Sequence, residues 1–277
     1  MVSIASLLPP LPCLKIVDVG AMPVSGPEPY ERLVSAVPCE IVGFEPTPGV
    51  CEELNRTKGP RHKYLPHVVG DGSLRTFHET QSPVNSSLFE PNFALLEKFH
   101  QLAPVFHVIR KSPVQTVRLD DIPETQGVDF LKVDVQGAEL LVFSGARERL
   151  KDALVIHTEV EFAPLYKNQP LFADVDIFIR SQGFAFHKLS YYGGTFRPLI
   201  FYNNANVTVS QLLWGDAVYV RDFMDFESLS PEALLKLAVI LHENYKSYDL
   251  AAVALGAHDQ KTGMRLQPEY LRRLMTA

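Results

Sequence analysis

Short apolar runs alternate with helical patterns along most of the chain, and this alternation predicts the fold. Strand-like runs rich in β-branched and aromatic residues are followed by segments with apolar residues at helical spacing. We expect strands at 13–20, 39–46, 67–70, 114–122, 128–135, 153–162, 184–189 and 213–222. Strands that alternate with helices are typical of a mainly parallel sheet covered on both faces.

The helical patterns complete this interpretation. We expect helices at 28–37, 47–55, 91–103, 137–150 and 172–182, the last with Gly183 just after its end. The run LRTFHET, after the Asp71–Gly72 turn signal, predicts an antiparallel partner for the third strand. Beyond Asp222 the pattern is helical, at 231–245, 250–255 and 269–275. The sequence therefore predicts a Rossmann-like domain over 1–222 and a helical extension over 223–277.

Composition narrows the choice of partners. The net charge is −6 and no long basic run is present, so we expect no nucleic-acid partner. The three cysteines, Cys13, Cys39 and Cys51, have no metal-binding spacing. No segment reaches the roughly 20 apolar residues of a membrane span, and we expect a cytoplasmic protein. A homodimer is compatible with the sequence but not required by it.

Acidic residues stand at the ends of the expected strands. Asp18, Glu45 and Asp134 each close a strand, as do Glu159 and Glu161 together. In open parallel sheets ligands bind at the carboxyl ends of the strands, so this edge is where we expect the chemistry.

The turn after the first strand favours a ligand that has an adenosine but no diphosphate. It reads DVGAMPVSG and lacks GxGxxG, with Met22 and Pro23 where a pyrophosphate would need close backbone approach. Glu45 follows Gly20 by 25 residues, a spacing suited to an acid on ribose hydroxyls. Asp71 is placed to accept from an adenine amine. The order of these features indicates S-adenosylmethionine (SAM).

Several motifs together resemble one enzyme family. VDVGA, GFEP, SSL, RLDD, FLKVDVQGAE and EVEFAPLY, between about residues 16 and 197, are similar to the FkbM family of SAM-dependent O-methyltransferases. The resemblance implies a class I methyltransferase fold: seven mostly parallel strands with the last one antiparallel. It also implies methyl transfer to a hydroxyl of a small acceptor, either a sugar or glycan or a secondary metabolite.

The candidate residues follow from the strand ends and this resemblance. We expect general-base or acceptor-binding roles for Asp134, Glu159 and Glu161. The resemblance implies no metal, although such acids would also suit magnesium or calcium. Cofactor contacts are expected from Asp18, Gly20, Ala21, Glu45, Pro46, Gly70, Asp71, Ser87 and Asp134.

Lys132 and Asp134 share one face of their strand, because side chains alternate. A lone buried Lys132 would be costly, so we expect it to pair with a strand-end acid, and Glu159 is the first candidate. Asp134 has an alternative role as an acid that bonds the amides of the following helix. His157 reads as a hydrogen-bonded core residue, and Glu139 as compensation for the helix dipole.

Two other function classes stay open. One is a Rossmann enzyme that uses NAD or a nucleotide sugar, which the missing GxGxxG disfavours. The other is a non-catalytic methyltransferase-like binding module that assembles through its C-terminal helices.

Overall fold

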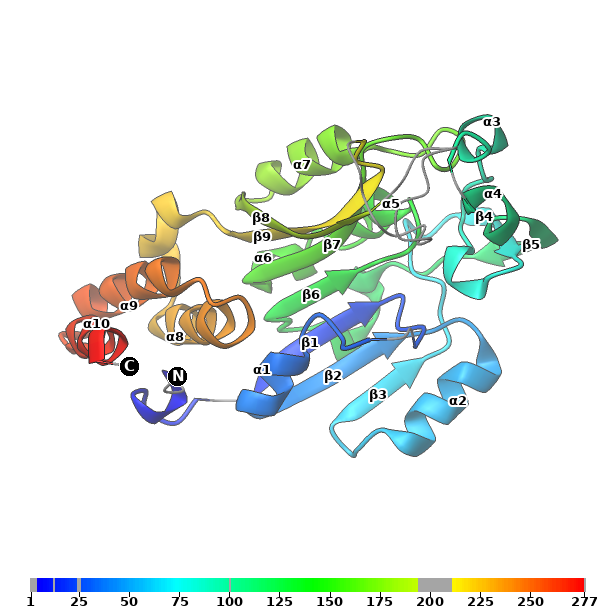
Figure 1. Ribbon diagram of the computed structural model, residues 1–277. Helices are drawn as coiled ribbons and strands as arrows, with labels where there is room; N and C mark the ends of the chain where they lie inside the picture. The colour runs from blue at the N-terminus through cyan, green and yellow to red at the C-terminus, as the bar shows by residue number, and fades with distance from the viewer. Residues whose placement is uncertain (1–3, 12, 24–25, 100, 194–210, 277) are drawn as a thin grey trace.

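One seven-stranded sheet organises the molecule in the computed structural model, which describes residues 4–11, 13–23, 26–99, 101–193 and 211–276 (Figure 1). The strand order is β3-β2-β1-β6-β7-β9-β8. Strand β9 runs antiparallel to both of its neighbours, whereas β1, β2, β3, β6 and β7 pair in parallel. This arrangement confirms the predicted fold class. The strands are β1 (Leu14–Val19), β2 (Cys39–Phe44), β3 (His62–Leu65), β6 (Phe130–Val133), β7 (Val155–Glu161), β8 (Phe184–Gly193) and β9 (Trp214–Arg221).

Both faces of the sheet are buried, which explains the continuous apolar runs of the central strands. On one face, Ile16, Phe130 and Val155 pack into a core that continues into the C-terminal helices. On the other, Val17 and Leu131 pack into a second core. Alternate residues of each strand thus enter different cores, as the pleat requires.

Helices cover the two faces in separate groups (Figure 1). The second core contains residues from α5 (Glu139–Ser144), α6 (Arg149–Asp152) and α7 (Phe172–Ser181). Strand β3 contacts a helix of its own, α2 (Pro48–Thr57). The first core contains residues from α1 (Glu31–Ala36), α8 (Pro231–Val239), the π-helix η6 (Ile240–Asn244), α9 (Tyr248–Thr262) and α10 (Leu266–Thr276).

The segment between β3 and β6 departs most from the prediction. The third strand lies at His62–Leu65 rather than at 67–70, where only Val69 bridges to Val117. LRTFHET forms β4 (Leu74–Thr80), which pairs with β5 (Val108–Gln115) and not with the third strand. The strand expected at 114–122 does not form: its first two residues end β5, Val117 makes an isolated bridge, and Leu119–Asp121 is 3-10 helical (η3).

The helix expected at 91–103 is two short helices, α3 (Phe93–Leu96) and α4 (Leu102–Val105). Gln101 has a φ of 60°, a left-handed conformation that a continuous helix cannot contain. Leu96, Phe99 and Leu102 still pack together, in a separate cluster with Tyr166 and Leu213. The apolar stripe is therefore a local core.

The helix expected at 137–150 is also divided, between α5 and α6. Gly145 separates the two, and a side chain there would lie 2.2 Å from the carbonyl oxygen of Gly70. The helix at 172–182 agrees with the prediction, and Gly183 follows it with a φ of +83°.

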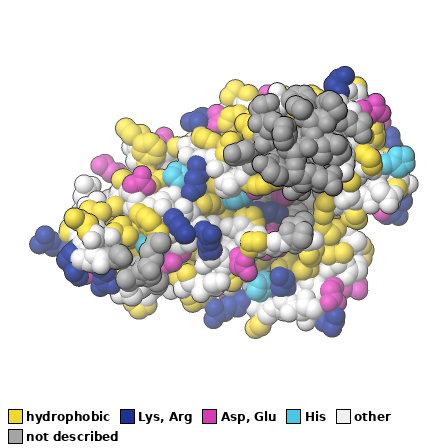
Figure 2. All heavy atoms as spheres, viewed as in Figure 1, with side chains coloured by type: hydrophobic (Ala, Val, Ile, Leu, Met, Phe, Trp, Pro, Cys, Tyr) yellow, Lys and Arg dark blue, Asp and Glu magenta, His cyan; other side chains and the backbone are white. Residues whose placement is uncertain are grey.

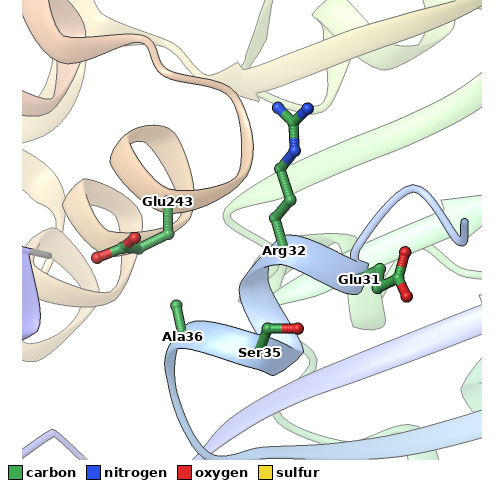
Figure 3. Close-up of a pocket in the computed structure, with 5 residues that line it drawn as sticks. All are labelled: Glu31, Arg32, Ser35, Ala36 and Glu243. Carbon is green, nitrogen blue, oxygen red and sulfur yellow. The ribbon is translucent and has the colours of Figure 1, made fainter. Parts of the chain in front are cut away.

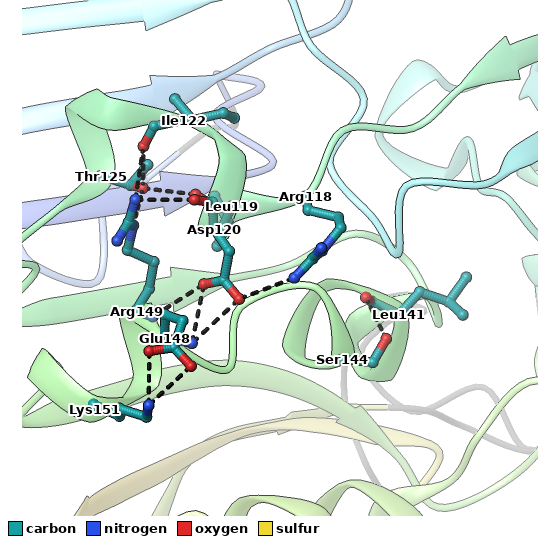
Figure 4. Close-up of polar contacts among 10 residues, drawn as sticks. All are labelled: Arg118, Leu119, Asp120, Ile122, Thr125, Leu141, Ser144, Glu148, Arg149 and Lys151. Atoms are coloured by element: carbon teal, nitrogen blue, oxygen red, sulfur yellow. Dashed lines mark hydrogen bonds and ion pairs between the residues drawn. The ribbon is translucent and has the colours of Figure 1, made fainter.

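The RLDD motif has a structural role (Figure 4). The Asp120 carboxylate accepts from the backbone amides of Glu148 and Arg149 and so caps the start of α6. The Arg149 side chain donates to Thr125 Oγ1 and to the Asp120 carbonyl. These bonds fix the chain on both sides of β6, at the 3-10 turn η4 (Pro123–Thr125). Another 3-10 turn, η2 (Pro83–Asn85), follows β4.

The C-terminal helices share the first core with the strands, since Leu237 and Ile240 lie in it beside Ile16. A 3-10 segment, η5 (Phe223–Ser228), connects β9 to α8, and another, η1 (Ile4–Ser6), lies near the start of the chain. The boundary at residue 222 stays a prediction about chain organisation. Among the described residues, none of the helices is both long and apolar enough to cross a membrane.

Candidate active site

The sheet order brings the strand-end acids to one edge. Strands β2, β1, β6 and β7 are neighbours and parallel, so Glu45, Asp18, Asp134 and Glu161 lie along their carboxyl ends. Glu159 lies opposite Asp216 of β9 in the sheet register. The edge where we expect ligands therefore carries a row of carboxylates.

Lys132 is buried and pairs with Asp18. Its Nζ lies 3.1 Å from Asp18 Oδ1 and donates to the Gly20 carbonyl at 2.6 Å. The other oxygen of Asp18 accepts from the Tyr30 hydroxyl at 2.7 Å. Burial works to lower the pKa of Lys132, but the charges of Asp18 and Asp134 outweigh it and the pKa is raised.

The prediction that Lys132 pairs with a strand-end acid is confirmed, and the choice of Glu159 is wrong. Strand β6 lies between β1 and β7, with Lys132 level with Asp18 on one side and with His157 on the other. Asp18 is thus the acid at the same height in the sheet, whereas Glu159 is one pleat further along.

Gly20 and Ala21 form a tight turn after β1. Gly20 has a φ of +84°, and a side chain there would lie 1.9 Å from the Asp134 carbonyl oxygen. Both amides donate to the Phe44 carbonyl, which ties the turn to β2. Only glycine fits this contact, so the turn lies directly against the end of β6.

Glu45 retains acceptor capacity at the end of β2. It is buried, and its Oε1 accepts from the Thr47 amide at 2.7 Å, while Oε2 makes no hydrogen bond among the described residues. Pro46 follows it directly and is partly exposed. Glu45 can therefore still accept from a ligand hydroxyl.

Asp71 already has protein partners. It accepts from the Ser73 hydroxyl and from Arg75 at 2.5 Å each. Although burial opposes the shift, the bonds to Arg75 and Ser73 lower the pKa of Asp71 to about 2. Gly70, just before it, packs against Thr116. A role of Asp71 toward a cofactor stays a prediction, and it would compete with this ion pair.

Ser87 is tied to the loop after β6. Its hydroxyl donates to the Gln136 carbonyl at 2.6 Å and accepts from the Phe89 amide at 3.0 Å. The side chain is buried. Ser87 thus links the β4–β5 region to the strand ends, and its predicted cofactor contact is untested.

Three carboxylates gather at the ends of β6 and β7. One oxygen each of Asp134, Glu139 and Glu159 lies within 4.8 Å of the other two. Glu161, two residues after Glu159, is buried. We refer to these four residues as the acid cluster.

The three glutamates of the acid cluster have raised pKa values. Burial, opposed by bonds from the amides of Val135 and Gly137, raises the pKa of Glu139 to about 7. For Glu159 and Glu161, burial together with the neighbouring charge of Asp134 raises the pKa well above the ordinary value. The Glu139 carboxyl, with its pKa of about 7, can exchange a proton near neutral pH.

Among the described residues, Asp134 makes no hydrogen bond to an amide of the following helix. Glu139, in the first turn of α5, accepts with its Oε1 from the amides of Val135 and Gly137, which lie in the turn before the helix. Asp134 instead accepts from the Gln136 side chain at 2.9 Å. The alternative role for Asp134 as a helix acid is therefore wrong.

Gln136 is the residue of this site to which the sequence assigned no role. Its amide nitrogen contacts both Asp134 and Glu159, and its amide oxygen lies 3.1 Å from the Tyr166 hydroxyl. The available signal was its position two residues after Asp134, on the same side of the strand.

His157 is a core residue, as predicted. It is buried, its Nδ1 lies 3.0 Å from the Tyr245 hydroxyl, and its ring stacks on the Tyr245 ring at 6.2 Å. On its other side, Nε2 lies 3.6 Å from Asp216.

A separate surface pocket of about 350 Å³ lies between α1 and η6 (Figure 3). It contains none of the residues that the sequence singled out. On the face seen in Figure 2, basic side chains are mixed with acidic ones over the described residues. The pocket is lined by Glu31, Arg32, Ser35, Ala36 and Glu243.

The chain is similar to several methyltransferases. The chain is 28% identical over 171 residues to the 2-O-methyltransferase NoeI of Sinorhizobium fredii (strain NBRC 101917 / NGR234), which covers 58% of this chain and 70% of that protein. It is 28% identical over 159 residues to Methyltransferase 1 of Beauveria bassiana (strain ARSEF 2860), in an alignment that covers 52% of this chain and 62% of that protein. A solved structure of methyltransferase FkbM from Methylobacillus flagellatus KT aligns with a TM-score of 0.41 and 16% identity, over 78% of this chain and 45% of that one.

The family itself is shown by a domain match. The Methyltransferase FkbM domain matches residues 18–186, which is more than half of the 277 residues. The matched range runs from Asp18 through the acid cluster to the start of β8. The chain therefore belongs to the FkbM family of S-adenosylmethionine-dependent methyltransferases.

Proposed function

We propose that this protein transfers a methyl group from SAM to a hydroxyl of a small acceptor, a sugar, glycan or secondary metabolite, in the cytoplasm. The observation that carries the proposal is the acid cluster at the ends of β6 and β7. A hydroxyl is a weak nucleophile, so a carboxylate within hydrogen-bond reach assists its attack. Similarity to a protein named a 2-O-methyltransferase supports oxygen as the methylated atom.

The residues at the edge of the sheet fit the cofactor. The Gly20–Ala21 turn lies against β6, and buried Glu45 has one oxygen with no hydrogen bond among the described residues, which suits ribose hydroxyls. When bound, SAM supplies the methyl group on a positively charged sulfur.

The acid cluster has two tasks in this proposal. One carboxylate accepts the hydrogen bond of the acceptor hydroxyl and orients its oxygen toward the methyl group. The acceptor oxygen would bond the methyl carbon as the methyl–sulfur bond breaks and S-adenosylhomocysteine leaves, and the hydroxyl proton would pass to that carboxylate. Asp134, Glu159 and Glu161 are the candidates, because Glu139 is already bonded to two backbone amides.

Substitutions can separate chemistry from cofactor binding. We expect Asp134→Asn and Glu161→Gln to lower kcat by about a hundredfold or more, the usual worth of a general base. Each variant should keep its Kd for SAM within about threefold of the wild-type value, since the lost group acts on the acceptor. Glu45→Gln should instead weaken the binding of SAM, with little change in kcat. The measurements are calorimetric titration with SAM and detection of S-adenosylhomocysteine over a panel of sugars and phenols.

The control is Glu124→Gln, which changes an exposed acid paired with Lys63 on the surface. It should leave both constants unchanged. Stabilisation of the wild-type protein by NAD and not by SAM would refute the proposal. SAM binding without turnover over a broad acceptor panel would favour a non-catalytic binding module.

A further inference from the structure

Gln136 has an unusual backbone conformation. Its φ is +59°, and Gly137 after it has a φ of +90°. A left-handed conformation costs a non-glycine residue on the order of 1 kcal/mol, so it persists where other contacts hold it. Two such residues in succession turn the chain sharply after β6. The turn brings the Gln136 side chain back over the strand ends.

The amide nitrogen of Gln136 bridges two carboxylates on different strands. Its Nε2 donates to Asp134 Oδ1 at 2.9 Å and to Glu159 Oε2 at 2.7 Å. An amide nitrogen carries two protons, and here each has its own acceptor. The bridge holds Asp134 and Glu159 close together, with carboxylate oxygens within 4.8 Å of one another, although like charges so close repel.

The rest of Gln136 is fixed by buried partners. The Tyr166 hydroxyl lies 3.1 Å from the amide oxygen and 2.9 Å from the Asn85 carbonyl, between which its proton is shared. Ser87 donates to the Gln136 carbonyl at 2.6 Å. Tyr166 and Ser87 are buried, so water does not compete for these bonds. A hydrogen bond to the amide oxygen also strengthens donation by the nitrogen.

We propose that Gln136 is a positioning residue of the methyl-transfer site: its amide orients Asp134 and Glu159 and stabilises the pair in the form that accepts a proton. This inference rests on the proposed function. Gln136 itself acts through the two carboxylates and not on the acceptor.

The surroundings of the pair make this role necessary. Acids face it from α5, β7 and β9, and Lys132 is a cation that acts on Asp134. The surrounding negative charge opposes ionisation of Asp134 and Glu159, and the Gln136 amide, as a hydrogen-bond donor, favours their charged form. The titratable groups around the pair are Glu139, Glu161, Asp216, Lys132, Tyr166, Tyr191 and Glu28.

The first test needs no acceptor. Gln136→Met keeps the length of the side chain and removes both donors, while Gln182→Met makes the same change at the end of α7, where the amide donates to Ser181. The lost bonds matter most when the acids are charged. We expect the difference in Tm between Gln136→Met and wild type to be about twice as large at pH 8 as at pH 5. Gln182→Met should show a difference that does not depend on pH.

The second test follows turnover. Without the donors the acids hold protons more tightly, so the acidic limb of the kcat/KM profile should move up by about one pH unit. Gln136→Met should therefore lose about tenfold at low pH and recover to within about threefold of wild type at high pH. Tyr166→Phe, a milder change at the other end of the amide, should shift the limb in the same direction by less.

The outcomes of these tests distinguish the proposed role of Gln136 from the proposed function. A Tm difference equal at pH 5 and pH 8 would overturn the role of Gln136, as would a profile lowered by the same factor at every pH. Neither result would affect the proposed function, provided that wild type binds SAM and forms S-adenosylhomocysteine. Failure of wild type to bind SAM would remove the proposed function, and the stability test would still decide whether Gln136 supports the charged acids.

Discussion

Lys132 holds its charge inside the sheet through a closed set of partners. Its side chain is 8% exposed and that of Asp18 is 1% exposed. Asp18 bonds Tyr30 with one oxygen and pairs with Lys132 through the other, and Lys132 also bonds the Gly20 carbonyl. The pair thus connects the core of the sheet to the turn expected to contact the cofactor.

Removal of Lys132 should be costly. Lys132→Met leaves Asp18 buried without its cation, and we expect a loss of about 3 to 5 kcal/mol in the free energy of unfolding, measured in urea. Lys63→Met, which breaks the exposed pair with Glu124, should cost less than about 1 kcal/mol. The double variant Lys132→Met with Asp18→Asn should recover part of the loss. Similar costs for Lys132→Met and Lys63→Met would contradict this account.

Residue patterns predict which side chains are buried but not which of them pair with one another. Alternation along β6 shows that Lys132 points into a covered face, and burial then requires an acid. Its partner depends on which strand lies on each side, and only the sheet order supplies that. In the same way, the sequence does not show the left-handed turn at Gln136, after which Asp134 accepts from the Gln136 side chain while Glu139 accepts from the Val135 amide.

At the scale of elements, the C-terminal helices act as part of the central fold. Residues of α8, η6 and α9 pack in one core with β1, β2 and β6. Tyr245, just after η6, stacks on Phe130 at 6.3 Å and bonds His157. Lys188 of β8 donates to the Tyr245 carbonyl. The helices therefore hold the face of the sheet that carries Lys132.

A substitution within these helices should destabilise the whole molecule. Leu237 is fully buried in α8, and Leu237→Ala should cost about 2 to 5 kcal/mol. Val253 of α9 is 47% exposed, and Val253→Ala should cost less than about 0.5 kcal/mol. Calorimetry should show one transition that moves to lower temperature in Leu237→Ala. A second, separate transition for the helices would show that they unfold as an independent unit.

Elements with strong patterns are predictable, and the insertion before β6 is not. The sheet strands other than β3 follow from apolar runs, and α7 follows from its pattern and from Gly183 after the helix. Phe93, Leu96, Phe99 and Leu102 have the spacing of one continuous helix. The chain instead turns at Gln101, and Leu96, Phe99 and Leu102 pack in a cluster with Tyr166. Tertiary contacts outweigh helical periodicity in such short segments.

At the scale of the whole molecule, the acid cluster should make stability depend on pH. Burial raises the pKa of Glu139 to about 7 and the pKa of Glu159 and Glu161 well above the ordinary value. The folded protein then binds protons more tightly than the unfolded chain. The stability this gives is present below the unfolded value near 4.5 and is lost as pH rises through the folded values.

We therefore expect the free energy of unfolding to fall between pH 5 and pH 8. Urea midpoints at several pH values should show the fall, on the order of 1 to 3 kcal/mol. Glu161→Gln removes one of the groups and should flatten the curve. Asp71 acts in the opposite sense: its pKa is lowered to about 2, so the stability that it contributes is lost as the pH falls into strong acid. A curve of equal slope in wild type and Glu161→Gln would contradict the assignment.

The two ends of the described chain lie together, on the side of the sheet away from the acid cluster (Figure 1). Arg273 of α10 donates to the Ser6 hydroxyl at 3.1 Å, so η1 and α10 are in contact. An affinity tag, a fluorescent label or a surface linker at either end would leave the carboxyl edge facing solution. A short peptide that joins the ends would also permit a circular permutant opened at the exposed turn of residues 58–61.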